Sequence, residues 1–230
     1  MSINPKTALL QEYALVARAL SAPARLMLLE QLAQQERGVE ALAEKSGLTI
    51  ANCSQHLQNL RRAGLVTSRR DGKAVIYRLT DAKTLQLMDL LRIVAERNLA
   101  QVERLLRGLS DGEDAPEPVS RDELAARLAE GAVTVLDVRP PDEFASGHIP
   151  GALNATLQQL ELILPTLDRD AVIVAYCRGP YCIYAHQAVA ALRKYGLNAR
   201  RLEGGLPEWR EEGRPVRVSL PDACISDEGE

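Results

Sequence analysis

The stretch of residues 171–186, AVIVAYCRGPYCIYAH, constrains the fold more than any other part of the chain. A continuous apolar run rich in β-branched residues stops at Cys177, crosses a short Gly-Pro loop and continues in a helical pattern. Such a run is typical of a buried parallel strand. In open α/β sheets the reactive groups lie at the edge where these strands end. The stretch therefore predicts an α/β domain with a thiol at the carboxyl end of a strand.

We expect Cys177 to be a nucleophile with a lowered pKa. The N–H groups of the loop and the positive end of the next helix form an anion site, and Arg178 adds a positive charge beside it. Both effects favour the thiolate over the thiol. An arbitrary Cys at a strand end is more often a small buried residue, but the Gly-Pro loop and the adjoining Arg favour the reactive interpretation.

The length of 230 residues is sufficient for two domains of modest size. The sequence has no apolar run long enough to span a membrane, and its start lacks the pattern of a secretory leader, so we expect a cytoplasmic protein. Four Cys with irregular spacing indicate reduced thiols rather than a disulfide framework. We find no Gly-rich phosphate loop or other cofactor motif and expect no cofactor.

The formal net charge of −3 hides an asymmetry between the two halves. Residues 1–108 carry 16 Lys and Arg against 10 Asp and Glu, whereas residues 109–230 carry 12 against 21. A basic front half joined to an acidic back half indicates that only the front half meets a polyanion.

The front half has the pattern of a helix-turn-helix domain. Apolar spacing predicts a helix over residues 8–20, a second from the N-cap Ser21 to about Gln34, and a third over residues 39–46. A Gly-containing turn then leads into a helix with a polar outward face. The face carries donors and acceptors suited to base edges and phosphates, namely Thr49, Asn52, Ser54, Gln55, His56, Gln58 and Arg62. A merely solvated face more usually contains Glu and Lys, so DNA is favoured.

Two strand-like runs, residues 65–70 and 73–79, surround the hairpin dipeptide Asp71-Gly72. We interpret this hairpin as a wing. The basic residues near its tip, which would reach phosphates or a minor groove, are Arg69, Arg70 and Lys73. A solvated basic hairpin is the alternative interpretation.

The order of helices, wing and long helix resembles ArsR-type winged-helix repressors over about residues 5–107. The segments that carry the resemblance are SAPARL, SQHL, LRRAGLV and AVIYRL, which end at Leu26, Leu57, Val66 and Leu79. Residues 81–107 repeat apolar side chains three and four apart, which predicts one long helix that pairs with its own copy and with the first helix. The resemblance implies a homodimer whose two recognition helices meet an inverted repeat in double-stranded operator DNA.

The sequence departs from this family at the positions where many members bind metals. Residues 39–46 contain no Cys, and residues 81–107 contain no His. Cys53 alone cannot supply the three or four ligands that a soft ion requires, so we expect no metal site in the front domain. By its helical spacing Cys53 faces inward as a packed core thiol, and a redox role is the alternative.

Residues 109–119 are rich in Gly, Pro and acids, which indicates a linker between a first domain over residues 1–108 and a second over residues 120–218. Ser120 opens a capping-box pattern at the start of the second domain. Strands are predicted over residues 133–138, 171–176 and 199–202, and helices over residues 121–130, 157–164 and 183–195. This alternation predicts a parallel α/β sheet, followed by an acidic tail over residues 219–230.

Three segments of the second domain resemble a single-domain rhodanese in the same order: residues 137–152, the Cys177 loop and residues 203–216. The resemblance implies a rhodanese-like parallel sheet and a Cys177 that accepts sulfur as a persulfide. It also implies a loop that cradles the outer sulfur through its backbone N–H groups, formed by Arg178, Gly179, Pro180, Tyr181 and Cys182. We interpret four further polar residues as structural, namely Asp137, Arg139, Glu143 and His148. Arg139 is expected to pair with an acid.

The six-residue loop suits a sulfur atom better than a phosphate. Cys-loop phosphatases and arsenate reductases need an Arg that closes on the oxyanion, whereas this loop ends in Cys182-Ile183. Two roles stay open for Cys182. It resolves a Cys177 persulfide or sulfenate into a disulfide, or it packs at the start of the helix.

These patterns predict a DNA-binding transcriptional regulator, a repressor by resemblance, whose rhodanese domain takes sulfur from thiosulfate or another persulfide. We hypothesise that sulfur loading changes operator affinity, through transfer to Cys53 or through docking of the rhodanese domains. Two alternatives stay open. In one, the chain is a sulfurtransferase that uses the front half as a dimerising scaffold. In the other, it senses arsenite or another metalloid through Cys177, Cys182 and Cys224.

Overall fold

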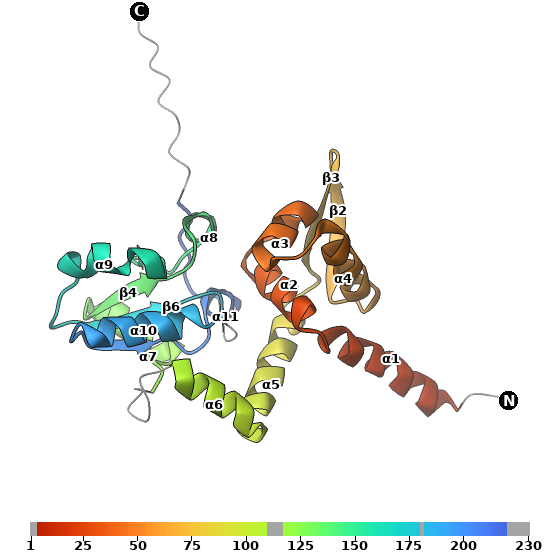
Figure 1. The fold of residues 1–230 in the computed structure, drawn as a ribbon, viewed down its shortest axis with the longest axis horizontal. Coiled ribbons are helices and arrows are strands. Elements are labelled where there is room, and N and C mark those ends of the chain that lie inside the picture. The colour runs from red at the N-terminus through yellow and green to blue at the C-terminus, as the bar shows by residue number, and fades with distance from the viewer. Residues whose placement is uncertain (1–3, 110–116, 180–181, 220–230) are drawn as a thin grey trace, which may run out of the picture. The chain divides into compact units, whose positions relative to one another are not determined.

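The computed structural model describes residues 4–109, 117–179 and 182–219. The chain divides into two compact units, Met1–Ile93 and Val94–Glu230 (Figure 1). Most of the predicted linker lies outside the described residues, so the domain boundary at residues 109–119 stays a prediction. Among the described residues, every helix is too short or too polar to cross a bilayer.

The N-terminal unit consists of helices and a small antiparallel sheet. Its elements are α1 (Pro5–Leu20), α2 (Pro23–Gln34), β1 (Arg37–Gly38), α3 (Val39–Ser46), α4 (Ile50–Arg62), β2 (Val66–Asp71), β3 (Ala74–Leu79) and the start of α5 (Lys83–Asn98). The sheet has the strand order β1-β3-β2. The β2–β3 hairpin closes at the Asp71–Ala74 pair, with Gly72 in the left-handed region at φ 59°. The predicted helix-turn-helix and wing are confirmed.

The turn between α3 and α4 is defined by its caps. Gly47 ends α3 in a left-handed conformation, which a residue without Cβ adopts at little cost. The Thr49 hydroxyl then accepts a hydrogen bond from the Asn52 N–H and caps α4. The apolar face of α4 consists of Cys53, Leu57 and Leu60, which are fully buried. Their spacing of four and three places them on one side of the helix.

Two predictions about helix ends are wrong. Ser21 does not cap α2, because its hydroxyl donates to the Arg18 carbonyl at 2.8 Å and so satisfies an open group at the end of α1. The predicted single helix over residues 81–107 is divided at Leu99 into α5 and α6 (Ala100–Leu109). The Asn98 side chain donates to the Val94 carbonyl at 2.8 Å, a local bond that competes with the helical pattern.

The C-terminal unit contains a parallel sheet with the strand order β5-β4-β6-β7. After α6 its elements are α7 (Arg121–Glu130), β4 (Val133–Asp137), α8 (Pro141–Ser146), β5 (Leu153–Asn154), η2 (Leu157–Gln159), α9 (Leu160–Ile163), η3 (Leu164–Thr166), β6 (Val172–Tyr176), α10 (Tyr184–Lys194), β7 (Ala199–Arg201) and α11 (Leu206–Glu211). The predicted parallel α/β sheet is confirmed. The short elements α8, β5 and α11 had no periodic signal long enough to predict them.

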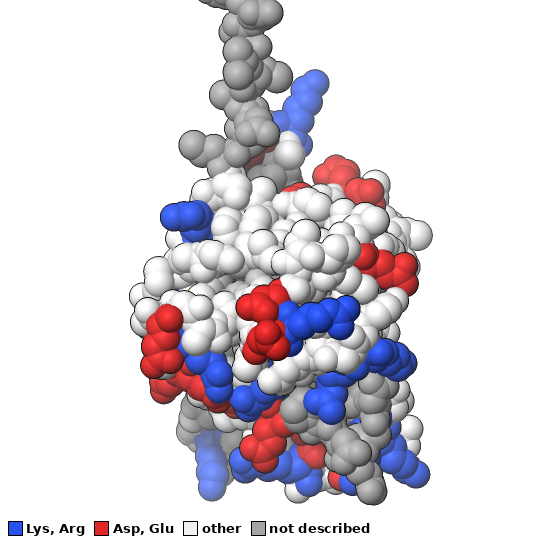
Figure 2. All heavy atoms as spheres, turned by 90° about the vertical axis from the view of Figure 1, so that its left-hand side faces the viewer, with Lys and Arg blue, Asp and Glu red and all other residues white. Residues whose placement is uncertain are grey.

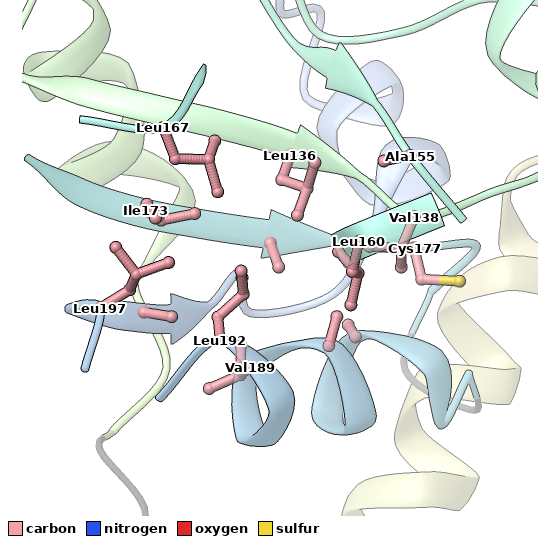
Figure 3. Packing of buried hydrophobic residues seen from close by; sticks show 14 of the residues in the cluster. Leu136, Val138, Ala155, Leu160, Leu167, Ile173, Cys177, Val189, Leu192 and Leu197 are labelled. Carbon is pink, nitrogen blue, oxygen red and sulfur yellow. The ribbon is translucent and has the colours of Figure 1, made fainter. Parts of the chain in front are cut away.

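Strand β6 is buried on both faces of the sheet. Ile173 and Ala175 point into one apolar cluster, together with side chains of α10 (Figure 3). Val174 and Tyr176 point into a second cluster that contains Trp209 of α11. Because successive side chains of a strand alternate between faces, an uninterrupted apolar run fits only this doubly covered position.

A fully buried ion pair lies at the carboxyl end of β4. Arg139 Nη2 lies 2.6 Å from Asp137 Oδ2, and both side chains have no exposed surface. The same guanidinium donates to the Gly147 carbonyl at 2.6 Å. The expected pairing of Arg139 with a neighbouring acid is therefore confirmed, and the pair ties β4 to the end of α8.

Replacement of Leu57 by Ala should lower the free energy of unfolding by about 2–5 kcal/mol, because it leaves a cavity in a fully buried site. Urea unfolding followed by far-UV circular dichroism measures the change. The exposed neighbour Gln58 provides the control, since Gln58→Ala should stay within about 0.5 kcal/mol of wild type. A loss below about 1 kcal/mol for Leu57→Ala would contradict the packing of α4.

Asp137→Asn should destabilise the C-terminal unit by about 3–5 kcal/mol, because it removes the negative charge that is paired with the fully buried Arg139. The fluorescence of Trp209, the single Trp of the chain, follows unfolding of this unit. The matched control is Asp122→Asn. It removes the ion pair between Arg214 and Asp122, and the Asp122 side chain is 91% exposed. That variant should lose less than about 1 kcal/mol, and equal losses in both would argue against the buried pair.

Candidate functional site

Cys177 directly follows β6 and lies at the carboxyl edge of the parallel sheet (Figure 3). Its side chain is 1% exposed and belongs to the apolar cluster under α10. A disulfide joins it to Cys182, with the two Cα atoms 6.2 Å apart. The expectation of reduced thiols is therefore wrong for this pair. Pro180 and Tyr181, which the sequence assigned to the sulfur-binding loop, lie outside the described residues. The structure thus brings together the two cysteines at the ends of the loop.

Glycines at two positions allow the loop to pack closely. Gly179 has a φ of 150°, which a residue with a Cβ rarely adopts, and its carbonyl accepts a hydrogen bond from the Cys182 N–H at 3.1 Å. A Cβ on Gly205 would lie 2.5 Å from the Gly179 nitrogen and 2.6 Å from the Cys177 carbonyl oxygen. The segment before α11 therefore supports the loop through direct backbone contact, which only Gly permits.

The charge of Arg178 is compensated by an acid from a distant segment. Its Nε and Nη2 atoms both lie 2.9 Å from oxygens of Glu143, whose side chain is fully buried in α8. The guanidinium also lies 5.9 Å from the centre of the Tyr184 ring. The sequence predicted a full positive charge beside Cys177. The ion pair corrects that expectation, and the backbone N–H groups stay as the source of positive potential.

A cavity of about 220 Å³ adjoins the loop residue Arg178. It is lined by Val138, Pro140, Thr156, Leu157, Gln158, Arg178 and Tyr184. The lining combines apolar carbons, neutral polar groups and one compensated guanidinium. Through Arg178 the cavity reaches the loop that follows Cys177.

His148 has a structural position, as expected from the sequence. Its ring stacks on Phe144 with centroids 3.8 Å apart, and Nδ1 lies 3.0 Å from the Phe144 carbonyl oxygen. The backbone of His148 pairs in both directions with Arg217. These contacts secure the bend that follows α8.

Most of the predicted DNA-contacting residues of α4 are exposed in the N-terminal unit. The exposed set is Thr49, Asn52, Gln55, Gln58 and Arg62, whereas Ser54 and His56 are half-buried. The Thr49 hydroxyl is engaged in the helix cap. The Nδ1 atom of His56 is buried and has no hydrogen-bond partner among the described residues. The His56 ring is thus turned further inward than the sequence predicted.

The wing residues Arg69, Arg70 and Lys73 are all exposed. Arg69 pairs with Asp71 in the hairpin and with Glu36, which precedes β1. Glu36 was not recognised from the sequence, because it lies 33 residues before its partner. Arg70 and Lys73 are therefore better placed than Arg69 for a phosphate contact.

Cys53 is fully buried, and its thiol lies 3.7 Å from the Val39 carbonyl oxygen. Burial raises the pKa of this thiol to about 11, because the thiolate would lose its hydration. The interpretation of Cys53 as a packed core thiol is confirmed. Among the described residues, no three His, Cys, Asp or Glu side chains form a group that could hold a metal ion. Cys224 lies outside the described residues.

The comparisons with known proteins agree with this architecture. A helix-turn-helix domain family matches residues 20–69, and the rhodanese-like domain family matches residues 120–212. The chain is 42% identical over 217 residues to the HTH-type transcriptional regulator Rv0324 of Mycobacterium tuberculosis, a match that covers 94% of this chain and 95% of that protein. Over 100 residues it is 32% identical to a sulfurtransferase of Allochromatium vinosum, a match that covers 43% of this chain and 92% of the sulfurtransferase.

Among solved structures, the winged helix-turn-helix domain of Mb0332 from Mycobacterium bovis is 38% identical, with a TM-score of 0.40. The match covers 43% of this chain and 92% of that domain. The similarity to Rv0324, by contrast, extends over nearly the full length of both proteins and defines the family. The chain belongs to the HTH-type transcriptional regulators in which an ArsR-type winged-helix domain precedes a C-terminal rhodanese-like domain.

Proposed function

We propose that this regulator is a homodimeric, operator-binding repressor whose rhodanese-like domain accepts sulfur as a persulfide on Cys177. The sulfur donor is thiosulfate, polysulfide or another persulfide, and sulfur loading changes operator affinity. The observation that carries the proposal is the position of Cys177, which follows the doubly buried strand β6 and begins a loop supported by the backbone of Gly205. The likeness to a named sulfurtransferase supports the same chemistry.

The charge distribution supports DNA contact through the N-terminal unit. Helix α4 presents an exposed face of amides, and the wing adds the exposed cations of Arg70 and Lys73. On the face of the C-terminal unit in Figure 2, acidic and basic side chains are interspersed between broad uncharged areas. A surface of mixed sign does not attract a polyanion strongly, so this face is not a candidate DNA surface. The 12 Lys and Arg against 21 Asp and Glu over residues 109–230 also favour DNA contact through the N-terminal unit.

The apolar surface of α1 and α5 supports a homodimer. Leu10 and Tyr13 of α1 are 53% and 62% exposed, and Leu90 and Val94 of α5 are 59% and 57% exposed. Soluble monomers rarely expose neighbouring large apolar side chains at this density. The related domain of Mb0332 is described as homodimeric. A two-fold dimer brings two α4 helices to the half-sites of an inverted repeat.

The properties of Cys53 favour domain docking over sulfur transfer as the route of coupling. A persulfide passes to a thiolate, yet burial raises the pKa of Cys53 to about 11 and the side chain is fully covered. Transfer to Cys53 would require the N-terminal core to open. A change in how the rhodanese-like domains dock on the dimer needs no such opening.

Simultaneous replacement of Arg70 and Lys73 by Ala should weaken binding to DNA from upstream of the gene. The slope of log K against log salt should decrease in magnitude by about 0.9 for each phosphate that the variant no longer neutralises, because fewer counterions are released. Fluorescence anisotropy at several salt concentrations measures the slope. Lys194→Ala, an exposed cation of the C-terminal unit, should leave it unchanged. An unaltered slope in the double variant would remove the wing from the DNA interface.

Treatment of the reduced protein with thiosulfate or polysulfide should shift the DNA-binding isotherm of wild type but not of Cys177→Ser. Cys53→Ala should keep the response, since docking does not use that thiol. Loss of the response in Cys53→Ala would instead support transfer to the N-terminal unit. If wild type and Cys177→Ser bind DNA equally with and without sulfur, Cys177 is a catalytic thiol unconnected to DNA binding, and the coupling is disproved.

A further inference from the structure

We propose that Cys182 resolves the Cys177 persulfide, so that the rhodanese-like domain reduces sulfane sulfur to sulfide and retains the oxidation as a Cys177–Cys182 disulfide. The inference rests on the proposed function, because it requires Cys177 to accept sulfur first. It adds an activity, release of sulfide, and it selects one of the two roles that the sequence left open for Cys182.

The geometry brings the two sulfur atoms into bonding contact. The Cα atoms of Cys177 and Cys182 are 6.2 Å apart, within the range of about 4.4–6.8 Å that a disulfide spans. A hydrogen bond from the Cys182 N–H to the Gly179 carbonyl, 3.1 Å long, also joins Cys182 to the described part of the loop that follows Cys177. The backbone of Gly205, packed against the loop, limits its movement away from Cys177. The attacking thiol is thus held beside its target.

The reaction has two balanced steps. In the first, the Cys177 thiolate attacks the outer sulfur of thiosulfate, and sulfite leaves with the electron pair of the broken S–S bond. In the second, the Cys182 thiol passes its proton to the outer sulfur of the persulfide. The resulting Cys182 thiolate attacks Cys177 Sγ, and hydrosulfide leaves with that proton and with the electron pair of the persulfide bond. Two thiols are oxidised to one disulfide while thiosulfate is reduced to sulfite and sulfide. An external dithiol then reduces the disulfide and restores both thiols.

Burial favours this internal route over transfer to an external thiol. Cys177 and Cys182 are 1% and 7% exposed, so an external thiol reaches the persulfide less readily than Cys182 does. Cys182 lies beside Cys177, and a neighbouring group on the same chain acts at a high effective concentration.

The two fates of the persulfide differ in which sulfur Cys182 attacks. Attack on the inner sulfur releases sulfide and leaves the disulfide present in the structure. Attack on the outer sulfur would move the persulfide to Cys182 and release nothing. The regulator would then carry a sulfur atom, whereas in our proposal it carries a disulfide after the sulfur has left as sulfide.

The test uses the reduced full-length protein without oxygen or added reductant, mixed with thiosulfate or, separately, inorganic polysulfide. Sulfide, free thiols and intact mass are measured together. Wild type should release one equivalent of sulfide per chain, lose two thiols and lose the mass of two hydrogen atoms. Peptide mapping should place the new disulfide between Cys177 and Cys182, a result that needs no variant.

Cys182→Ser and Cys182→Ala should release no sulfide and should gain the mass of one sulfur atom on Cys177. Two substitutions are used because Cys182 packs in the apolar cluster, and circular dichroism identifies a variant that fails to fold. Cys53→Ala and Cys224→Ser provide matched thiol controls and should behave as wild type. Equal sulfide release from folded Cys182 variants and wild type, or release that depends on Cys224 instead, would overturn the inference.

The failure of the proposed function has a different signature. If neither wild type nor the Cys182 variants gain sulfur or release sulfide, Cys177 is not a sulfur acceptor and both proposals fail. If wild type retains a persulfide and releases no sulfide, Cys177 accepts sulfur and only the role of Cys182 is disproved.

Discussion

The C-terminal unit depends on the burial of β6 on both faces. One row of its side chains packs against the cluster under α10, and the other packs against the cluster that contains Trp209. A strand in this position cannot shift register by one residue, because every side chain would then point into the wrong cluster. Cys177 follows the last residue of the strand. The same packing that stabilises the sheet thus determines where the thiol lies.

Acidic residues from distant segments form ion pairs with cations of both candidate sites. Arg178 is neutralised by the buried carboxylate of Glu143, and Arg69 is held by Glu36. Burial of an ion pair such as Asp137–Arg139 costs the hydration of both charges. The attraction between the two charges offsets this cost only while both partners are present. Because Glu143 holds Arg178, the backbone N–H groups of the loop are the donors that stay for an anion.

The two units place cysteines in opposite chemical situations. Cys53 is covered by the core of the N-terminal unit, and its high pKa keeps it protonated at neutral pH. Cys177 and Cys182 are also buried, but their sulfur atoms are joined in a disulfide. Among the described cysteines, Cys177 and Cys182 form a bond with each other, whereas Cys53 is free and belongs to the apolar face of α4.

Much of the fold was predictable from local pattern. The apolar run before Cys177, the Gly-containing turn before α4 and the Asp-Gly hairpin each specify an element within a few residues, so both domain classes and most elements were correct. The break at Leu99 and the cap of α2 were missed, because single side-chain bonds to a carbonyl decide them. The short elements α8, β5 and α11 lack a periodic signal.

The sequence by itself determined that a winged-helix domain precedes a parallel α/β domain with a cysteine at a strand end, since local periodicity and motif spacing carry that information. Only the tertiary structure decided which charges stay available and which thiols meet. Glu143 reaches Arg178 across 35 residues, and Gly205 packs against the Gly179 backbone of a loop that precedes it in the chain. Such contacts arise from packing in three dimensions, and no local pattern of residues reports them.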